Sequence, residues 1–229
     1  MLSSKHQAVA KRIFGKGAFK FGAFRLKLHD INPDAPLSPF YIDLRDKDNP
    51  KPGPLDASDY DLIVLSILET IREADIVFDA IAGIPNAGTP IINALARLME
   101  KSSALSQGDF RVIELKKVEV DGKRKIVPMP GFEYKAGERI LLVDDLITQA
   151  DTKLEAIAAV EGSGSVVAGV VVLVDRMQGG REQLEKAGYK LLASFTVKDL
   201  FDFYLVEKMI SAEKYSESWE YVQSQQKAV

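Results

Sequence analysis

The sequence has no cysteine and only two histidines, His6 and His29, among its 229 residues. The lack of cysteine excludes disulfide scaffolds, iron–sulfur clusters, cysteine-ligated zinc and thiol nucleophiles. Both histidines lie near the N-terminus, which argues against histidine-based triads and multi-histidine metal sites. These two shortages remove most thiol and imidazole chemistry from consideration.

Clustered positive charge and long apolar runs are also missing. The 30 basic and 33 acidic residues give a net charge of −3, which argues against a nucleic-acid coat or a membrane-surface binder. No stretch reaches the roughly 18 apolar residues of a membrane span, and the N-terminus lacks the apolar region of a signal peptide. We therefore predict no nucleic-acid partner, no membrane association and a cytoplasmic location.

What the chain does have is an ordinary globular composition, with 46% hydrophobic residues, and a regular alternation of patterns. From Asp75 onward, short β-branched runs alternate with longer segments of helical period, which is typical of βαβ units and a parallel sheet. The valine-rich run 165–174 has no polar face, which predicts a strand covered on both sides. Strands are expected at 76–82, 110–115, 139–144, 165–174 and 190–195, and helices at 58–73, 87–100, 152–161, 180–187 and 197–211.

The N-terminal part has a different pattern. Apolar and polar residues alternate over 24–28 and 40–44, which predicts half-exposed antiparallel strands joined by the turn-rich segment 32–39. The expected fold class is therefore α/β, with a doubly wound, mainly parallel sheet, helices on both faces and a small N-terminal β-hood. The expected division is a hood (1–56), an α/β core (57–211) and a polar C-terminal tail (212–229).

An apolar strand that ends in two carboxylates marks the candidate site. In the run 140–152, Asp144 and Asp145 follow the strand, and a turn with Thr148 leads into a helix. Such carboxylates can accept hydrogen bonds from a diol or lie near a hydrated Mg²⁺, and a helix N-terminus suits a phosphate. In an open α/β sheet, ligands bind at this end of the strands. The residues alone also allow a structural reading, in which Thr148 or Asp151 simply caps the helix.

Three other protein classes use a similar strand with a carboxylate. A P-loop NTPase needs Gly-x-x-x-x-Gly-Lys-Ser/Thr, and no such run occurs. A dinucleotide-binding fold needs Gly-x-Gly-x-x-Gly after a strand, whereas Gly162 and Gly164 precede one and position 167 is valine. A phospho-receiver domain would place its acidic pair in the first strand. All three classes are disfavoured.

The motifs resemble those of the type I phosphoribosyltransferases and, among these, of the orotate phosphoribosyltransferases. The resemblance covers most of the chain and is carried by four regions in the family's order: the hood (24–28 with 38–45), a glycine-containing loop (81–90), the acidic strand end (140–152) and a downstream segment (174–189). It implies transfer of a phosphoribosyl group from 5-phosphoribosyl 1-pyrophosphate (PRPP) to a nucleobase, with orotate as the implied base. It also implies Mg²⁺ as cofactor and a homodimer.

The resemblance gives matching residues their expected roles. Asp144 and Asp145 would hold the ribose hydroxyls of PRPP and help to place Mg²⁺, indirectly through substrate or water. PRPP would further contact Gly83, Ile84, Pro85, Asn86, Ala87, Gly88, Thr148, Gln149, Ala150, Asp151 and Thr152. The planar, anionic base would contact Lys27, Phe40, Tyr41, Thr148 and Arg176. Without the resemblance, Phe40 reads equally well as hood core, and Lys27 as a solvated strand residue.

The charged segment 116–125 is placed like the family's mobile catalytic loop, with Lys116, Lys117 and Lys123 as candidate catalytic residues. A plain solvated hairpin is the alternative interpretation. The segment departs from the family pattern, because Glu119 stands where a lysine is usual and Asp121 where a histidine or an aromatic residue is usual.

The phosphate loop departs from the family pattern as well, because Gln149, Ala150 and Asp151 replace small residues and glycine. An inward Asp151 would oppose a phosphate by roughly 4 kcal/mol at an effective dielectric near 20, whereas an outward one would change little. Asp151 and Glu119 therefore keep a second hypothesis open, a non-catalytic relative that binds a nucleotide as a regulator. A transferase for a base other than orotate is a further alternative, and a plain structural or assembly protein is disfavoured because the loops are too specific.

Overall fold

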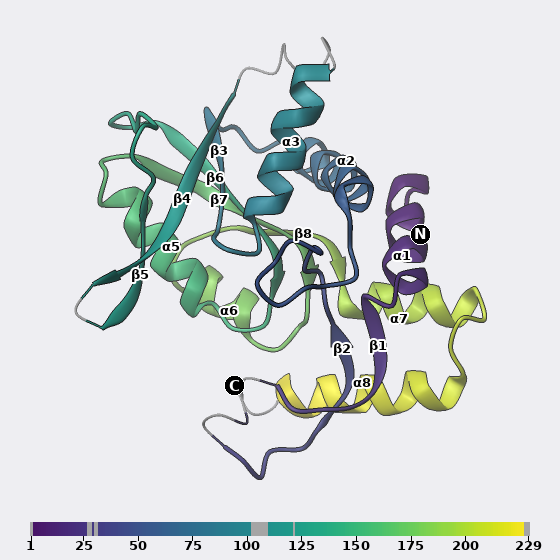
Figure 1. Cartoon of the computed structure of the whole chain (residues 1–229). Helices are drawn as coiled ribbons and strands as arrows, with labels where there is room; N and C mark the ends of the chain where they lie inside the picture. Colours follow the sequence, from purple (N-terminus) through teal and green to yellow (C-terminus); the bar gives the residue numbers. More distant parts are fainter. Residues whose placement is uncertain (1, 27–28, 30–31, 102–109, 121, 227–229) are drawn as a thin grey trace.

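The computed structural model describes residues 2–26, 29, 32–101, 110–120 and 122–226. At its centre is a six-stranded sheet in the order β5-β4-β3-β6-β7-β8 (Figure 1). All neighbouring strands are parallel except β4 and β5, which form an antiparallel hairpin. The strands are β3 (Ala80–Gly83), β4 (Arg111–Val120), β5 (Lys123–Pro128), β6 (Arg139–Ile147), β7 (Val166–Asp175) and β8 (Leu191–Thr196). The predicted doubly wound, mainly parallel fold is confirmed.

Helices cover both faces of this sheet. α2 (Ala57–Glu73) and α3 (Thr89–Lys101) pack on one face, and α5 (Asp151–Glu161) and α6 (Gly180–Lys186) pack on the other. Alternate residues of β7 enter the two cores, with Val171 on the α2 side and Val172 on the α5 side. The valine-rich strand is therefore buried on both faces, as its sequence predicts. No helix in the described part of the chain combines the length and apolarity needed to cross a bilayer.

The hood is a two-stranded antiparallel sheet of β1 (Phe19–Phe24) and β2 (Ser38–Ile42). Its first strand lies earlier in the chain than the predicted 24–28. The reason is aromatic packing, because Phe19 stacks on Phe40 with ring centroids 5.8 Å apart and meets Phe201 of the core edge-on. Burial of these rings, rather than the later alternation, decides which residues pair.

A helix that the sequence analysis did not predict precedes the hood. α1 (Ser4–Gly15) packs against α2, and its buried residues His6, Val9 and Ile13 form the contact face. The side chain of Ser3 accepts a hydrogen bond from the N–H of His6 and caps this helix.

The C-terminal part forms two helices in place of the predicted single helix 197–211. α7 (Val197–Val206) is followed by a turn in which Lys208 has a φ of 57°, and this left-handed residue ends the first helix. The chain then turns back as α8 (Ala212–Gln226), which runs beneath β1 and β2 (Figure 1). Most of the predicted polar tail is therefore helical and packs against the hood.

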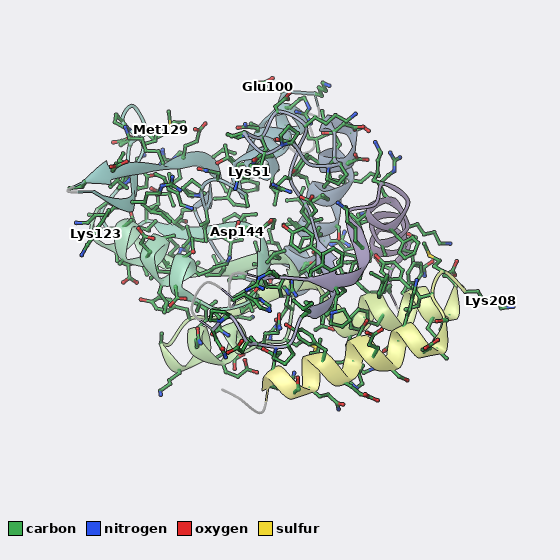
Figure 2. All side chains as sticks on the ribbon, turned by 60° about the horizontal axis from the view of Figure 1, so that its bottom comes forward. Lys51, Glu100, Lys123, Met129, Asp144 and Lys208 are labelled. Carbon is green, nitrogen blue, oxygen red and sulfur yellow. The ribbon has the colours of Figure 1, made fainter. Side chains whose placement is uncertain are left out.

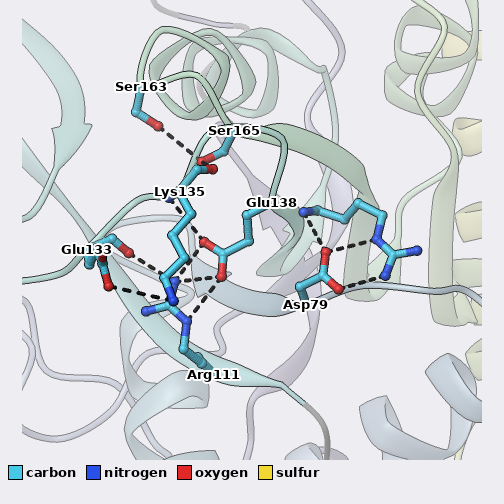
Figure 3. Close-up of polar contacts among 8 residues, drawn as sticks. Asp79, Arg111, Glu133, Lys135, Glu138, Ser163 and Ser165 are labelled. Atoms are coloured by element: carbon cyan, nitrogen blue, oxygen red, sulfur yellow. Dashed lines mark hydrogen bonds and ion pairs between the residues drawn. The ribbon is translucent and has the colours of Figure 1, made fainter.

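Ion pairs join the parallel strands at the edge where they begin (Figure 3). Glu138, buried just before β6, accepts hydrogen bonds from Nη2 of Arg111 through both carboxylate oxygens, at 2.6 and 2.7 Å. Asp79, just before β3, pairs with Arg139 at 2.6 Å. Ligands of open α/β sheets bind at the opposite edge, so we assign these pairs a structural role.

Candidate active site

The strand order of the sheet reverses between β3 and β6. The chain passes from β3 to β4 on one side and later enters β6 on the other side. The loops that follow β3 and β6 therefore leave the sheet as neighbours, at the position where open α/β sheets bind their ligands. A backbone hydrogen bond of 2.8 Å, from the N–H of Ile84 to the carbonyl of Val143, joins the two. The topology thus brings the two predicted PRPP segments together.

The loop after β3 is packed tightly against β6. A Cβ atom at Gly88 would lie 2.3 Å from the carbonyl oxygen of Val143, and one at Gly83 would lie 2.7 Å from the carbonyl oxygen of Gly88. The peptide between Pro85 and Asn86 is cis, and Asn86 is exposed. Packing within the protein therefore requires both glycines. Glycine at these positions would also let a ligand approach the backbone closely.

The first carboxylate at the end of β6 is held inside the protein. Asp144 is only 4% exposed, and its Oδ2 accepts a hydrogen bond of 2.6 Å from Nζ of Lys153. Lys153 is buried too and also donates to the carbonyl of Leu146 at 2.7 Å. Figure 2 shows Asp144 near the middle of the molecule. This buried, hydrogen-bonded ion pair fixes Asp144 between β6 and α5.

Lys153 is a site residue that the sequence analysis missed, although a signal was present. Lys153, Ala156, Ile157 and Val160 recur at spacings of three, one and three and are the buried residues of α5. A lysine within an apolar helical stripe indicates a buried partner, because a buried charge is rarely left unpaired.

The second carboxylate is the more open of the two. Asp145 is half-buried, and its Oδ1 accepts the N–H of Leu146 at 2.6 Å. Burial, and then the negative charge of Asp144, raise the pKa of the Asp145 carboxyl to about 7. Asp145 is therefore the member of the pair that a ligand can reach, and a ligand that donates hydrogen bonds would favour its ionised form.

Side chains fill the turn that leads into α5. Nε2 of Gln149 donates to the carbonyl of Gln178, and Nε2 of Gln183 donates to the side-chain oxygen of Gln149. The backbone N–H of Ala150 donates to Oε1 of Gln183 at 2.8 Å. A phosphate that used this N–H would therefore have to displace the Gln183 side chain.

Asp151 and Thr148, the other two residues of interest in this turn, differ in their exposure. Asp151 is exposed at the first position of α5, and no side chain caps that helix. Thr148 is half-buried, and its carbonyl accepts the N–H of Gly180 at 3.0 Å. Since the Asp151 side chain faces solvent, it does not occupy the helix N-terminus as an internal anion.

Arg176 and Phe40, two residues predicted for the base, lie against each other. Cζ of Arg176 is 4.7 Å from the centroid of the Phe40 ring, and Nε donates to Oε1 of Gln178 at 2.9 Å. Arg176 is 3% exposed, and within the described residues its Nη2 has no hydrogen-bond partner. Burial lowers the pKa of the guanidinium to about 10.

The other predicted base residues are less closely gathered. Phe40 is fully buried, so it belongs to the hood core while it also carries Arg176 on its face. Tyr41 is half-buried and packs on Phe24, with ring centroids 5.6 Å apart. Lys27 lies outside the described residues. Of the two cations predicted to contact the base, Arg176 is therefore the one that lies within the described residues.

The three predicted lid lysines lie on the β4–β5 hairpin. Lys117 and Lys123 are exposed, and Lys116 is half-buried. Figure 2 shows Lys123 at the end of the hairpin, well separated from Asp144. Strand β4 runs on to Val120, and its second half from Leu115 pairs with β5, which is the hairpin of the alternative interpretation. The structure thus does not bring the lysine of the hairpin end together with the carboxylates; Asp121 lies outside the described residues.

Comparison with known proteins bears on the same segments. Residues 61–196 match the phosphoribosyl transferase domain family. The orotate phosphoribosyltransferase of Pyrococcus abyssi is 32% identical over 197 residues, which are 86% of this chain and 95% of the relative. That of Pyrobaculum aerophilum is also 32% identical, over 84% of this chain and 87% of the relative.

A solved structure shares the arrangement of most of the chain. The UMP synthase of Leishmania donovani superposes with a TM-score of 0.73 at 27% identity, over 95% of this chain and 42% of that chain. The family match spans β3, β6 and the two loops at the point where the strand order reverses. The chain therefore belongs to the type I phosphoribosyltransferases, and among them to the orotate phosphoribosyltransferase group.

Proposed function

We propose that the chain transfers the phosphoribosyl group of PRPP to a ring nitrogen of orotate and releases orotidine 5′-monophosphate and pyrophosphate. The observation that carries the choice of base is Arg176, a buried guanidinium that lies over the Phe40 ring and whose Nη2 has no partner among the residues that the structure describes. An arginine fork matches the carboxylate of orotate, since it can donate two hydrogen bonds to one anion. The curated relatives named above support the same base.

The reaction breaks the bond between C1′ and the pyrophosphate oxygen and forms a bond between C1′ and the base nitrogen. Positive charge develops on the ribose and negative charge on the leaving pyrophosphate. In this proposal Asp145 accepts hydrogen bonds from the ribose hydroxyls, while Asp144, tied to Lys153, keeps the end of β6 in place. The segments 83–88 and 148–152 bind the pyrophosphate and the 5′-phosphate. Orienting both substrates lowers the entropic part of the barrier.

The chain's own residues fit a Mg²⁺ ion that arrives with PRPP better than a permanently bound metal. Within the described residues, no group of three or more His, Cys, Asp or Glu side chains could hold an ion, and Asp144 is already paired with Lys153. Mg²⁺ commonly uses one or two carboxylates and takes its other ligands from substrate phosphates and water. When bound, it would neutralise charge on the departing pyrophosphate.

The hairpin lysines and a second subunit complete the proposal. Lys116, Lys117 and Lys123 are proposed to act on the pyrophosphate from the hairpin, whose end lies away from Asp144 of the same protomer. The homodimer expected from the resemblance would place the hairpin of one protomer at the site of its partner. A closed site would also exclude water from the reacting ribose.

A non-catalytic nucleotide-binding protein is the second candidate function. The observation that favours it is the hydrogen bond from the Ala150 N–H to Gln183, which occupies a donor of the phosphate loop. Turnover separates the two candidates. A regulator would bind PRPP or a nucleotide in calorimetry and release no pyrophosphate with any base.

The Arg176 assignment is tested with matched ligands and matched variants. We expect the wild-type protein to release pyrophosphate with orotate and not with uracil, which lacks the carboxylate. Arg176→Gln should raise the KM for orotate about 10- to 100-fold, the usual effect of losing a hydrogen bond to a charged group. Arg72→Gln, at a position on α2 that is 74% exposed, serves as the control and should change nothing. Equal turnover of orotate and uracil would contradict the proposed base.

A further inference from the structure

The C-terminal helix α8 brings a residue to the ring of Phe40. α8 packs against β2 of the hood, and Figure 1 shows it running beneath the hood with its C-terminal end toward the side of α6. Tyr221, on the last turns of α8, meets the Phe40 ring edge-on, with ring centroids 6.2 Å apart and planes at 85°. Arg176 lies over the same Phe40 ring. Arg176, which follows β7, and Tyr221 of α8 thus both pack against the ring of Phe40 on β2.

Two of the side chains around Phe40 carry a buried polar atom that lacks a partner. Among the described residues only four buried side-chain atoms are unpaired: Ser66 Oγ, Arg176 Nη2, Ser218 Oγ and Tyr221 Oη. Tyr221 is 8% exposed and Arg176 is 3% exposed. An unpaired buried donor is costly, because it has lost its hydrogen bonds to water. Two such donors beside one aromatic ring indicate that a bound ligand accepts their hydrogen bonds.

We infer that Tyr221 is a specificity-determining residue whose hydroxyl donates a hydrogen bond to the carboxylate of the base, next to Nη2 of Arg176. A carboxylate suits both donors, since its two oxygens accept several hydrogen bonds at once. This inference rests on the proposed function, and it adds a residue that lies beyond the family match at 61–196. A base without a carboxylate would leave both donors buried and unpaired, which is an effective way to reject it.

The full-length variant Tyr221→Phe tests the inference, because it removes only the hydroxyl and keeps the ring against Phe40. We expect the KM for orotate to rise about 10-fold, while kcat, the KM for PRPP and the melting temperature stay near their wild-type values. Tyr215→Phe is the matched control, because Tyr215 lies on the same helix and donates to Asp202 at 2.7 Å. That control should leave the KM for orotate unchanged.

The outcomes separate this inference from the proposed function. A wild-type protein that consumes no orotate overturns both. An active wild type with an unchanged KM for orotate in Tyr221→Phe overturns the role of Tyr221 alone and leaves the proposed function standing. A variant in which the KM values for orotate and PRPP rise together shows a merely structural role and also overturns the inference.

Discussion

Asp144 and Asp145 are neighbours in the sequence, yet their surroundings give them different tasks. Asp144 is buried and paired with Lys153 at 2.6 Å, whereas Asp145 is half-buried and carries a pKa raised by burial and by Asp144. In the sequence the two residues form one acidic pair, because spacing alone does not show which carboxylate faces a cation. Only the packing of α5 against β6 makes that distinction.

The first prediction at this scale concerns Lys153. Replacing it by methionine keeps most of the side-chain volume but leaves Asp144 buried without its cation. Breaking a buried pair in this way typically costs about 3–5 kcal/mol, so urea unfolding of Lys153→Met should show a loss of that order.

Lys198→Met is the control for that experiment. Lys198 forms an ion pair with Asp202 in which both side chains are more than a third exposed, and such pairs contribute about 0–1 kcal/mol. If Lys153→Met were no less stable than Lys198→Met, the buried pair would not hold the end of β6.

The second residue-scale prediction concerns pH. Because the folded state raises the pKa of Asp145 to about 7, its contribution to stability is fully present below the ordinary carboxyl pKa and is lost as the pH rises through 7. Asp145→Asn removes this titration. In the absence of ligands it should melt several degrees above the wild type at pH 8, with a smaller difference at pH 5, and it should lack turnover. A wild type that melts above the variant at pH 8 would refute this account.

At the scale of the elements, the loops proposed to bind ligands and the ion pairs lie at opposite edges of the sheet. The proposed ligand loops follow β3 and β6, whereas the ion pairs of Figure 3 lie at the edge where the strands begin. Glu138 is central there, because Arg111 contacts both of its oxygens and it joins the start of β6 to β4.

Glu138→Ala should therefore destabilise the fold and spare the chemistry. We expect a loss of about 1.5–3 kcal/mol, the usual contribution of hydrogen bonds to a charged group, with unchanged KM values for both substrates. Glu133→Ala, at an exposed carboxylate 3.7 Å from Lys135, should lose less than about 1 kcal/mol. Chemical denaturation of both variants, with assays at a temperature where both are folded, makes the comparison. Altered substrate KM values in Glu138→Ala would contradict this separation.

Sequence patterns predicted the parallel strands and the core helices, because their burial follows simple periods, whereas β5 was expected only under the alternative hairpin interpretation of 116–125. They missed α1, although His6, Val9, Ala10 and Ile13 stand at helical spacing and are all buried. They also missed α8, whose mean hydropathy is low and whose buried residues are only Ser218, Tyr221 and Val222. The β1 strand was placed too late because the stacking of Phe19 on Phe40 is a contact between distant residues. Local pattern carries no information about such partners.

For the whole molecule, the order of the strands explains why motifs far apart in the sequence form one site. The segments 83–88 and 148–152 meet because the strand order reverses between β3 and β6, a rule that applies to open α/β sheets in general. The sequence could therefore predict the ligand end of the sheet. It could not predict that Arg176 is buried against Phe40, or that Tyr221 of a polar helix reaches the same ring.

The most direct test of the central claim is the absorbance of orotate on mixing the protein with PRPP and Mg²⁺. The account predicts a loss of absorbance that requires the protein, PRPP and Mg²⁺ together, with pyrophosphate released in equal amount, and no loss with Asp145→Asn. An orotate absorbance that stays constant with the wild-type protein, PRPP and Mg²⁺ would contradict the account, whether or not another base leads to release of pyrophosphate.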